Sequence, residues 1–270
     1  MNTSNLTTPW WHSVLESEFW PVIDLALEVG NFQSEHFRCL NLTTETKSSG
    51  VDLVTEVDRT SDQRIVQVLR QLFPEDAILS EEGGQIQSTS RRLWIVDPLD
   101  GTTNFASGLP VFAVSIALWE NGQPQFGVIF SPIIGDLAVS QIFKGAYLNG
   151  NRCSISTKET LNTCVVATGF PYDRATARNS NAENAARIIP KVRGLRRMGA
   201  AAYDLMLVAA GHLDAFWELR LSLWDIAAAK LMILESGGVF YEQESDGLYN
   251  IIVGNRSLVT QINTYVDLEN

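Results

Sequence analysis

The chain has 270 residues, 45% of them hydrophobic, a formal net charge of −11 and only three cysteines and three histidines. This composition allows a large buried core, while the acidic balance and the lack of a basic stripe argue against nucleic-acid binding. Scattered cysteines outside any Cys-x-x-Cys spacing are typical of reduced thiols, so we expect a cytoplasmic protein. Residues 1–9 show no signal-peptide pattern, and the uncharged apolar run ending at residue 119 is too short to span a membrane.

The first part of the chain has two helical patterns followed by β-like runs. Apolar residues recur at helical spacing over residues 11–40, where Pro21 and Gly30 could bend or break the helix, and over residues 60–73. Expected strands then cover residues 77–80, 93–96, 111–119, 125–130 and 136–142. Short connections containing glycine separate several of these runs, which favours an antiparallel sheet.

Strand-like and helix-like segments alternate in the second part of the chain. The expected strands cover residues 165–167, 195–197, 214–218 and 238–241, and the expected helices cover residues 179–189, 201–210 and 226–235. Alternation of this kind is typical of an α/β arrangement. We therefore divide the chain into an α+β part, residues 1–150, and an α/β part, residues 151–270.

The segment richest in chemistry is Trp94-Ile95-Val96-Asp97-Pro98-Leu99-Asp100-Gly101-Thr102-Thr103-Asn104-Phe105. An apolar strand leads into two carboxylates three positions apart, and carboxylate oxygens are ligands that hard divalent cations prefer. The Gly-Thr turn that follows offers backbone N–H groups to an anion. Pro98 lacks an N–H group, so we expect it to end the hydrogen-bonded ladder of the strand. The segment predicts a combined metal and phosphate site.

Four further segments carry residues that suit the same site. They are residues 47–58, which end at Asp58; residues 78–83, with an acidic pair at Glu81; residues 197–201; and residues 218–228, with Asp225. Together with the Asp-Pro-Leu-Asp-Gly-Thr-Thr-Asn-Phe run, they resemble the inositol monophosphatase family of metal-dependent, lithium-sensitive phosphatases, in consistent order from about residue 47 to residue 238. The resemblance implies a layered αβαβα sandwich, an antiparallel-sheet half followed by an α/β half, and a homodimer.

The resemblance also implies a role for each matching residue. Two Mg²⁺ ions, with a third weaker one beside Glu81, would be held by Glu81, Asp97, the carbonyl group of Leu99, Asp100 and Asp225. The catalytic residues would be Glu81, Asp58 and Thr102, the last two ordering the attacking water. The substrate would be bound through the phosphate-binding amides of Gly101 and Thr102, and through Gly199, Ala200 and Glu218 around its alcohol part.

Charge balance supports a metal site independently of the resemblance. Four clustered carboxylates repel one another strongly, and without cations they would be driven towards protonation. Two Mg²⁺ ions would balance them, and a dianionic phosphate ester could then bind. A pair of metal ions can also activate water and stabilise the leaving oxygen of such an ester.

Several of these residues also admit an ordinary structural interpretation. Asp58 and Asp225 could each cap a helix, and Glu218 could be either a substrate contact or a surface charge at a strand end. We expect a solvated side chain at Glu82, packing at Trp224 and surface roles for Arg196 and Arg197. Ala200 stands where the family often has a hydroxyl residue, which removes one side-chain hydrogen bond to the substrate and weakens the case for myo-inositol phosphate.

The sequence therefore predicts a Mg²⁺-dependent phosphatase acting on a small phosphate monoester, with inositol monophosphate as the first expectation. Histidinol phosphate and sugar phosphates such as fructose 1,6-bisphosphate are alternative substrates. A non-catalytic binding or regulatory homologue is the alternative of another class, which the loss of a metal carboxylate would favour; none is lost here. A haloacid-dehalogenase-type phosphatase would need an Asp-x-Asp strand end near the N-terminus, and the sequence lacks one.

Overall fold

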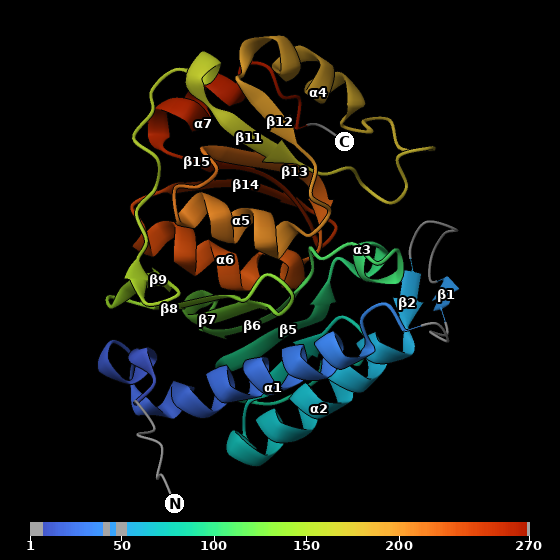
Figure 1. Cartoon of the computed structure of the whole chain (residues 1–270), viewed down its shortest axis with the longest axis vertical. Coiled ribbons are helices and arrows are strands. Elements are labelled where there is room, and N and C mark those ends of the chain that lie inside the picture. Colours follow the sequence, from blue (N-terminus) through green and yellow to red (C-terminus); the bar gives the residue numbers. More distant parts are fainter. Residues whose placement is uncertain (1–7, 40–43, 47–52, 269–270) are drawn as a thin grey trace, which may run out of the picture.

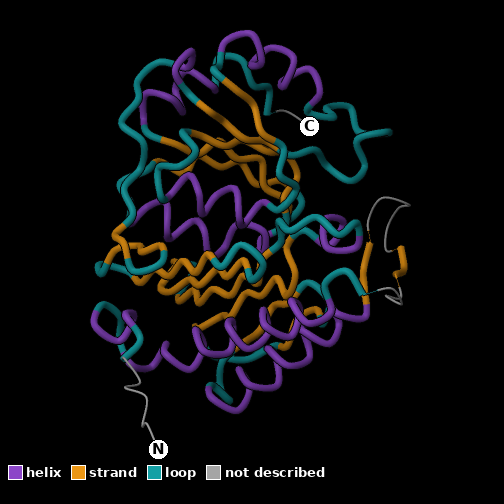
Figure 2. The backbone as a smooth tube through the Cα atoms, viewed as in Figure 1, coloured by secondary structure: helices purple, strands orange, loops and turns teal. Residues whose placement is uncertain are grey.

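Five layers of helices and strands build the protein, as the computed structural model shows for residues 8–39, 44–46 and 53–268 (Figure 1). Two sheets alternate with three helical layers, and the same alternation is visible in Figure 2. The outer layers are α1 (Trp20–His36) with α2 (Glu56–Leu72), and α4 (Ala182–Ile188) with α7 (Arg256–Ile262); the central layer is α5 (Ala201–Ala209) with α6 (Leu223–Glu235). The predicted αβαβα sandwich is confirmed.

The first sheet has the strand order β10-β9-β8-β7-β6-β5-β3-β4. Its strands are β3 (Ala77–Ser80), β4 (Gly84–Ile86), β5 (Arg92–Asp100), β6 (Ala113–Glu120), β7 (Gln123–Ser131), β8 (Asp136–Gln141), β9 (Gly145–Leu148) and β10 (Asn151–Arg152). All neighbours are antiparallel except β3 and β5, which are parallel. Asn121 and Gly122 connect β6 to β7 with φ of 52° and 74°. Positive φ at both central residues is what a two-residue type I′ hairpin turn requires.

The second sheet is mixed, with the order β12-β11-β13-β15-β14. Its strands are β11 (Val165–Thr168), β12 (Gly194–Arg196), β13 (Ala215–Leu221), β14 (Val239–Ser245) and β15 (Leu248–Gly254). β11 is parallel to both β12 and β13, whereas β15 is antiparallel to β13 and β14. The described residues also include a small antiparallel pair, β1 (Thr44–Thr46) and β2 (Leu53–Thr55).

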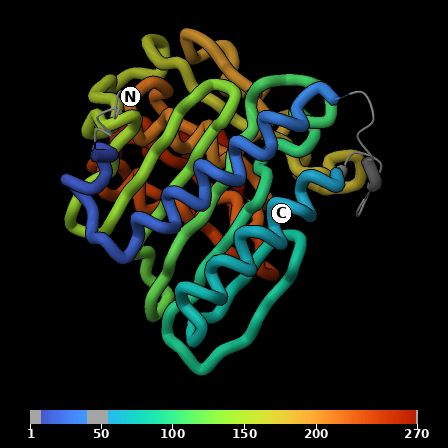
Figure 3. Tube along the Cα trace, turned by 60° about the horizontal axis from the view of Figure 1, so that its bottom comes forward, coloured from blue at the N-terminus to red at the C-terminus, as the bar shows by residue number. Residues whose placement is uncertain are grey.

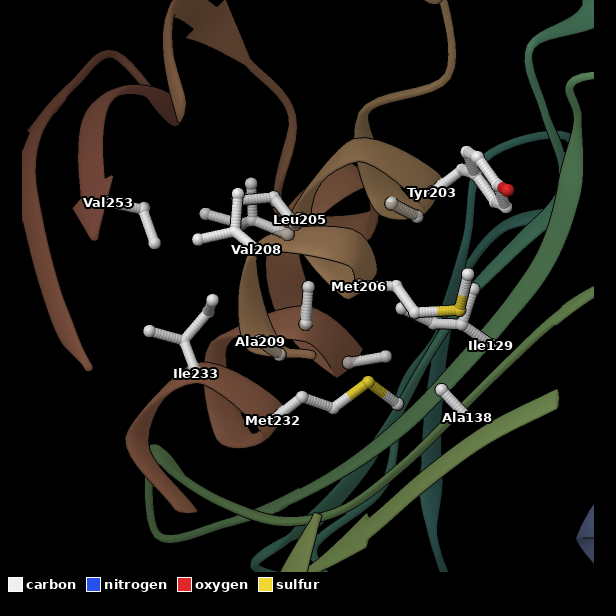
Figure 4. Close-up of a cluster of buried hydrophobic side chains, with 14 of the residues drawn as sticks. Ile129, Ala138, Tyr203, Leu205, Met206, Val208, Ala209, Met232, Ile233 and Val253 are labelled. Carbon is white, nitrogen blue, oxygen red and sulfur yellow. The ribbon is translucent and has the colours of Figure 1, made fainter. Parts of the chain in front are cut away.

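A continuous core joins the two sheets through α5 and α6. Ile129 and Ala138 of the first sheet face Met206 and Met232 of these helices, and Val253 of the second sheet closes the same cluster (Figure 4). Because side chains from both halves share this core, the proposed division at residue 150 stays a prediction.

Small side chains let α6 approach the first sheet closely. A Cβ placed on Gly127 of β7 would lie 2.8 Å from the backbone oxygen of Ala228. A close approach of this kind requires glycine on the strand and small residues on the helix. The alanine at position 228, in the segment that contains Asp225, therefore packs directly against β7.

The helices α1 and α2, which form the outer layer on the first sheet, lie side by side across that sheet (Figure 3). The helix expected over residues 11–40 is shorter in the structure, because two 3₁₀ turns, η1 (Trp10–Ser13) and η2 (Ser17–Phe19), precede α1. Pro21 lies in the first turn of α1, where its missing N–H group costs nothing, so it starts the helix and does not break it. Gly30 continues the helix and lies against the ring of Phe130.

Other expectations were wrong or incomplete. Pro98 does not end its strand: β5 continues to Asp100, with a shift in register between Asp97 and Asp100. A bulge tolerates proline because no ladder hydrogen bond is needed there. The sequence patterns missed β4, β9, β10, β15, α7 and the short helix α3 (Thr102–Ala106). Residues 47–52 of the segment that leads to Asp58 lie outside the described residues. No described helix is long and apolar enough to cross a bilayer.

Candidate active site

One cavity of about 280 Å³ gathers most of the predicted site residues. It lies where the ends of β5, β11 and β13 meet the first turns of α5 and α6. The predicted residues that line it are Glu81, Asp97, Leu99, Asp100, Gly101, Thr102, Gly199, Ala200, Glu218 and Asp225. Asp58 does not line the cavity; it is buried behind Thr102. The structure therefore brings together side chains that are up to about 150 positions apart in the sequence.

Strand direction places the first two carboxylates beside each other. β3 and β5 are parallel, so their carboxyl ends lie at the same edge of the sheet. Glu81 follows β3 directly, and its N–H donates to the backbone oxygen of Val96 at 3.1 Å. This hydrogen bond sets Glu81 next to Asp97 on the neighbouring strand.

The bulge in β5 explains how Asp97 and Asp100 can line one cavity. Residues three positions apart on a regular strand point to opposite faces. The shift in register between the two aspartates changes the direction of the strand at this point. Asp97 is fixed there because its Oδ1 accepts a hydrogen bond from the N–H of Leu99 at 3.0 Å.

Asp100 also satisfies the first turn of α5. Its Oδ1 accepts from the N–H of Ala201 at 3.1 Å, and its Oδ2 accepts from Ala202 at 2.7 Å and Tyr203 at 3.4 Å. The N-cap residue Ala200 has no side chain able to do this. The carboxylate of Asp100, at the end of β5, therefore caps α5 in place of an N-cap hydroxyl. Its negative charge is stabilised by the positive end of the helix dipole.

Asp58 and Asp225 both take the third helical position of a capping box, not the N-cap position itself. The N–H of Thr55 donates to Asp58 Oδ2 at 2.9 Å, and the N–H of Ser222 donates to Asp225 Oδ2 at 2.7 Å. A capping box uses one carboxylate oxygen. The second oxygen of Asp58 accepts from Thr102 Oγ1 at 2.6 Å, so a helix cap and a site contact coexist in one side chain.

The electrostatics of the carboxylate group favour bound cations. Burial first, and then repulsion from Glu81 and Asp100, raises the pKa of Asp97 and of Asp225 well above the ordinary range. Burial also raises the pKa of Asp100 to about 7, although three amides donate to it. Across the described parts of the chain no three Asp, Glu, His or Cys side chains form a ready-made metal cage. The donor set fits a cation that keeps water and substrate oxygens among its ligands, as Mg²⁺ does.

Three further charged residues, Arg197, Asp204 and Glu218, line the same cavity. Glu218 of β13 is half-buried and lines the cavity, so a contact with the substrate stays a prediction. Arg197 is exposed, as expected for a surface residue, and it also lines the cavity. Sequence reasoning missed Asp204, which is 2% exposed, although a lone carboxylate within the alanine-rich α5 was a usable signal. Trp224 packs against the main core, as expected, and borders the cavity.

Gly101 forms the turn at the start of α3. Its φ of 93° lies in the left-handed region, and a Cβ there would lie 3.0 Å from the backbone oxygen of Val111. Only glycine meets both conditions easily. The first amides of a helix lack partners within the helix, so the N–H groups around Gly101 and Thr102 are suited to an anion.

Comparisons with known proteins agree with this architecture. The model of the inositol monophosphatase family matches residues 16–264, so the chain belongs to this family. A relative from Pseudomonas aeruginosa, named Nus factor SuhB, is 40% identical over 228 residues, covering 81% of this chain and 84% of the relative.

Two solved structures are also similar. An IMPase of Thermotoga maritima has a TM-score of 0.83 and 32% identity, covering 93% of this chain and 98% of that chain. The inositol monophosphate-bound structure of SaIMPase-II has a TM-score of 0.76 and 26% identity, covering 93% of this chain and 94% of that chain.

Proposed function

We propose that this protein is a Mg²⁺-dependent phosphatase that hydrolyses a small phosphate monoester, with inositol monophosphate as the first substrate to test. One observation carries the proposal: a single small cavity is lined by the carboxylates of Glu81, Asp97, Asp100 and Asp225, and Glu218, Asp204 and Arg197 line the same cavity. Membership of the inositol monophosphatase family and the inositol monophosphate bound to the related SaIMPase-II support it.

The group of four carboxylates would hold the metal ions. Two or three Mg²⁺ ions would be bound by Glu81, Asp97, the carbonyl group of Leu99, Asp100 and Asp225. When bound, such ions would neutralise the carboxylates and the phosphate and polarise the ester. The carbonyl oxygen of Leu99 lies 3.1 Å from Thr102 Oγ1, and its lone pairs are available to a cation when the Thr102 proton is directed to Asp58.

Asp58 and Thr102 would order the attacking water. The hydroxyl proton of Thr102 is directed to Asp58 Oδ1, so the lone pairs of Thr102 Oγ1 remain available to accept a proton from water. Asp58 is itself fixed by the N–H and hydroxyl groups of Thr55. Together with Glu81 these are the proposed catalytic residues, and the amides of Gly101 and Thr102 would bind the phosphate oxygens.

The alcohol part of the substrate would lie towards Gly199, Ala200 and Glu218. Ala200 is buried and offers no hydroxyl, so the specific contact with the alcohol part falls to Glu218. A carboxylate accepts hydrogen bonds from hydroxyl groups. This chemistry favours a polyhydric alcohol over an apolar leaving group.

Phosphate release from a parallel substrate panel tests the proposal. The panel contains inositol monophosphate, histidinol phosphate and fructose 1,6-bisphosphate, each with Mg²⁺ and again with EDTA. We expect release with Mg²⁺, loss with EDTA and recovery on adding Mg²⁺ back, with the highest kcat/KM for inositol monophosphate. Full activity in metal-free buffer would contradict the metal assignment, and a preference for histidinol phosphate or the bisphosphate would change the substrate.

A non-catalytic binding role is the second candidate, because the relative that is 40% identical is named Nus factor SuhB. It is favoured if no ester of the panel is hydrolysed with Mg²⁺. The homodimer, the cytoplasmic location and the lack of nucleic-acid binding stay predictions, the last of them resting on the net charge of −11.

A further inference from the structure

Gly169 follows β11 directly and lines the cavity that Glu218 also lines. Its φ lies outside the left-handed region, so its backbone conformation does not require glycine. A Cβ placed on Gly169 would nevertheless lie 2.0 Å from Oε1, 2.2 Å from Cδ and 2.3 Å from Oε2 of Glu218. The carboxylate of Glu218 therefore occupies the space that the Cβ of any other residue at position 169 would need.

The backbone beneath this carboxylate is held firmly. Asn181 is fully buried, and its Nδ2 donates to the backbone oxygen of Gly169 at 2.6 Å and to Thr168 Oγ1 at 2.9 Å. Its Oδ1 accepts from Trp217 Nε1 at 2.9 Å, and Thr168 Oγ1 donates to the backbone oxygen of Trp217 at 2.6 Å. These hydrogen bonds tie the end of β11 to β13. A side chain at position 169 would therefore displace the Glu218 carboxylate more readily than the backbone.

Two further charged residues, Asp204 and Arg197, line the cavity together with Glu218. Asp204 lines the cavity with a buried Oδ1 that has no hydrogen-bond partner among the described residues. The guanidinium of Arg197 lies against Gly199: a Cβ placed on Gly199 would be 2.4 Å from Nη1 of Arg197. Glu218 and Arg197 thus offer an acceptor and a donor group to the cavity, and the buried Asp204 lies among its lining residues. This arrangement suits several hydroxyl groups of one small ring.

We propose that Gly169 is a positioning residue: the missing side chain at this position sets where the Glu218 carboxylate stands and thereby selects substrates whose alcohol part donates a hydroxyl to it. The inference rests on the proposed phosphatase function, and it adds a specificity determinant that contacts neither the metal ligands nor the phosphate.

The test is a double-mutant cycle of Gly169→Ala and Glu218→Ala, with kcat/KM measured for inositol monophosphate and for phenyl phosphate, which has no hydroxyl on its alcohol part. A hydrogen bond to a charged group corresponds to a loss of about ten- to a hundredfold. We expect each single variant to lose this much with inositol monophosphate and less than about threefold with phenyl phosphate. In the Glu218→Ala background, Gly169→Ala should add less than about twofold, because no carboxylate remains to be displaced.

Gly194→Ala is the matched control. It lies on the neighbouring strand β12, its φ is outside the left-handed region, and its Cβ would approach only the side-chain end of Arg196, at 3.1 Å. This variant should behave as the wild type. The proposal is wrong if Gly169→Ala turns over inositol monophosphate as the wild type does, or if its loss persists undiminished in the Glu218→Ala background.

A crystal structure of Gly169→Ala separates this inference from the proposed function. A displaced Glu218 carboxylate over an unchanged backbone is the expected result, and an unmoved carboxylate overturns the inference whatever the activity. Wild-type protein that hydrolyses no phosphate ester would instead refute the proposed function. In that case calorimetric binding of inositol monophosphate decides the inference: weaker binding by Gly169→Ala than by Gly194→Ala supports it, and equal binding overturns it.

Discussion

Replacing Thr102 with valine tests the hydrogen bond that links α3 to the start of α2. Thr102 Oγ1 donates to Asp58 Oδ1 at 2.6 Å and lies 3.1 Å from the backbone oxygen of Leu99. Asp58 is 1% exposed, so water cannot take the place of the lost donor without rearrangement. Valine keeps nearly the same volume and removes only the hydroxyl group.

The size of the effect follows from the charge of the acceptor. A hydrogen bond to a charged group contributes about 1.5–3 kcal/mol, so the free energy of unfolding of Thr102→Val should fall by about that amount at pH values above the folded-state pKa of Asp58. Burial raises the pKa of Asp58, while the hydrogen bonds from Thr102 and Thr55 lower it. The lost bond stabilises the ionised carboxylate, so the deficit should shrink as the pH falls through the folded-state pKa of Asp58.

Equilibrium urea unfolding in EDTA at several pH values measures this difference. Thr103→Val is the control, since the same substitution one residue further along removes a half-buried hydroxyl and should cost less than about 0.5 kcal/mol. A Thr102→Val protein as stable as the control, or a deficit that does not change with pH, would refute a charge-assisted bond at this position. The same variant should lower kcat for every substrate, because the proposed water-ordering pair is broken.

Three further outcomes are expected. Li⁺ should inhibit uncompetitively or in a mixed manner by occupying a Mg²⁺ position near Asp97, Asp100 and Asp225; steady-state kinetics measure this, and insensitivity to high Li⁺ would indicate a divergent second metal site. Asp97→Asn should damage turnover of every substrate in the panel, whereas a loss restricted to one substrate would contradict a role in metal binding. Burial raises the pKa of Asp204 to about 8, so its contribution to stability should fall as the pH rises from about 4 to 8. The unfolding free energy of Asp204→Asn relative to wild type should then rise across that window, and urea unfolding that shows no such trend would refute the assignment.

Local patterns were sufficient for most of the architecture. Periodicity identified α2, α5 and α6, the strands β3, β5, β6, β7 and β8 of the first sheet, and β11 and β13 of the second sheet within a few residues, because burial of one face imposes a regular spacing of apolar side chains. The inner strand β15 of the second sheet was missed. The family motifs led to the five-layer class. Short edge strands such as β4 and β10 lack that spacing, since they bury little, and so they were missed.

The sequence by itself determined which residue types stand at the ends of β3, β5, β13 and the start of α6, and that they belong to a carboxylate-rich site. Only the tertiary structure decided how they face each other. The bulge at Pro98 turns Asp97 and Asp100 towards one cavity, and the packing of α5 against β13 brings Arg197 and Asp204 to Glu218. These relations depend on contacts between segments distant in the chain, which no local pattern of apolar and polar residues encodes.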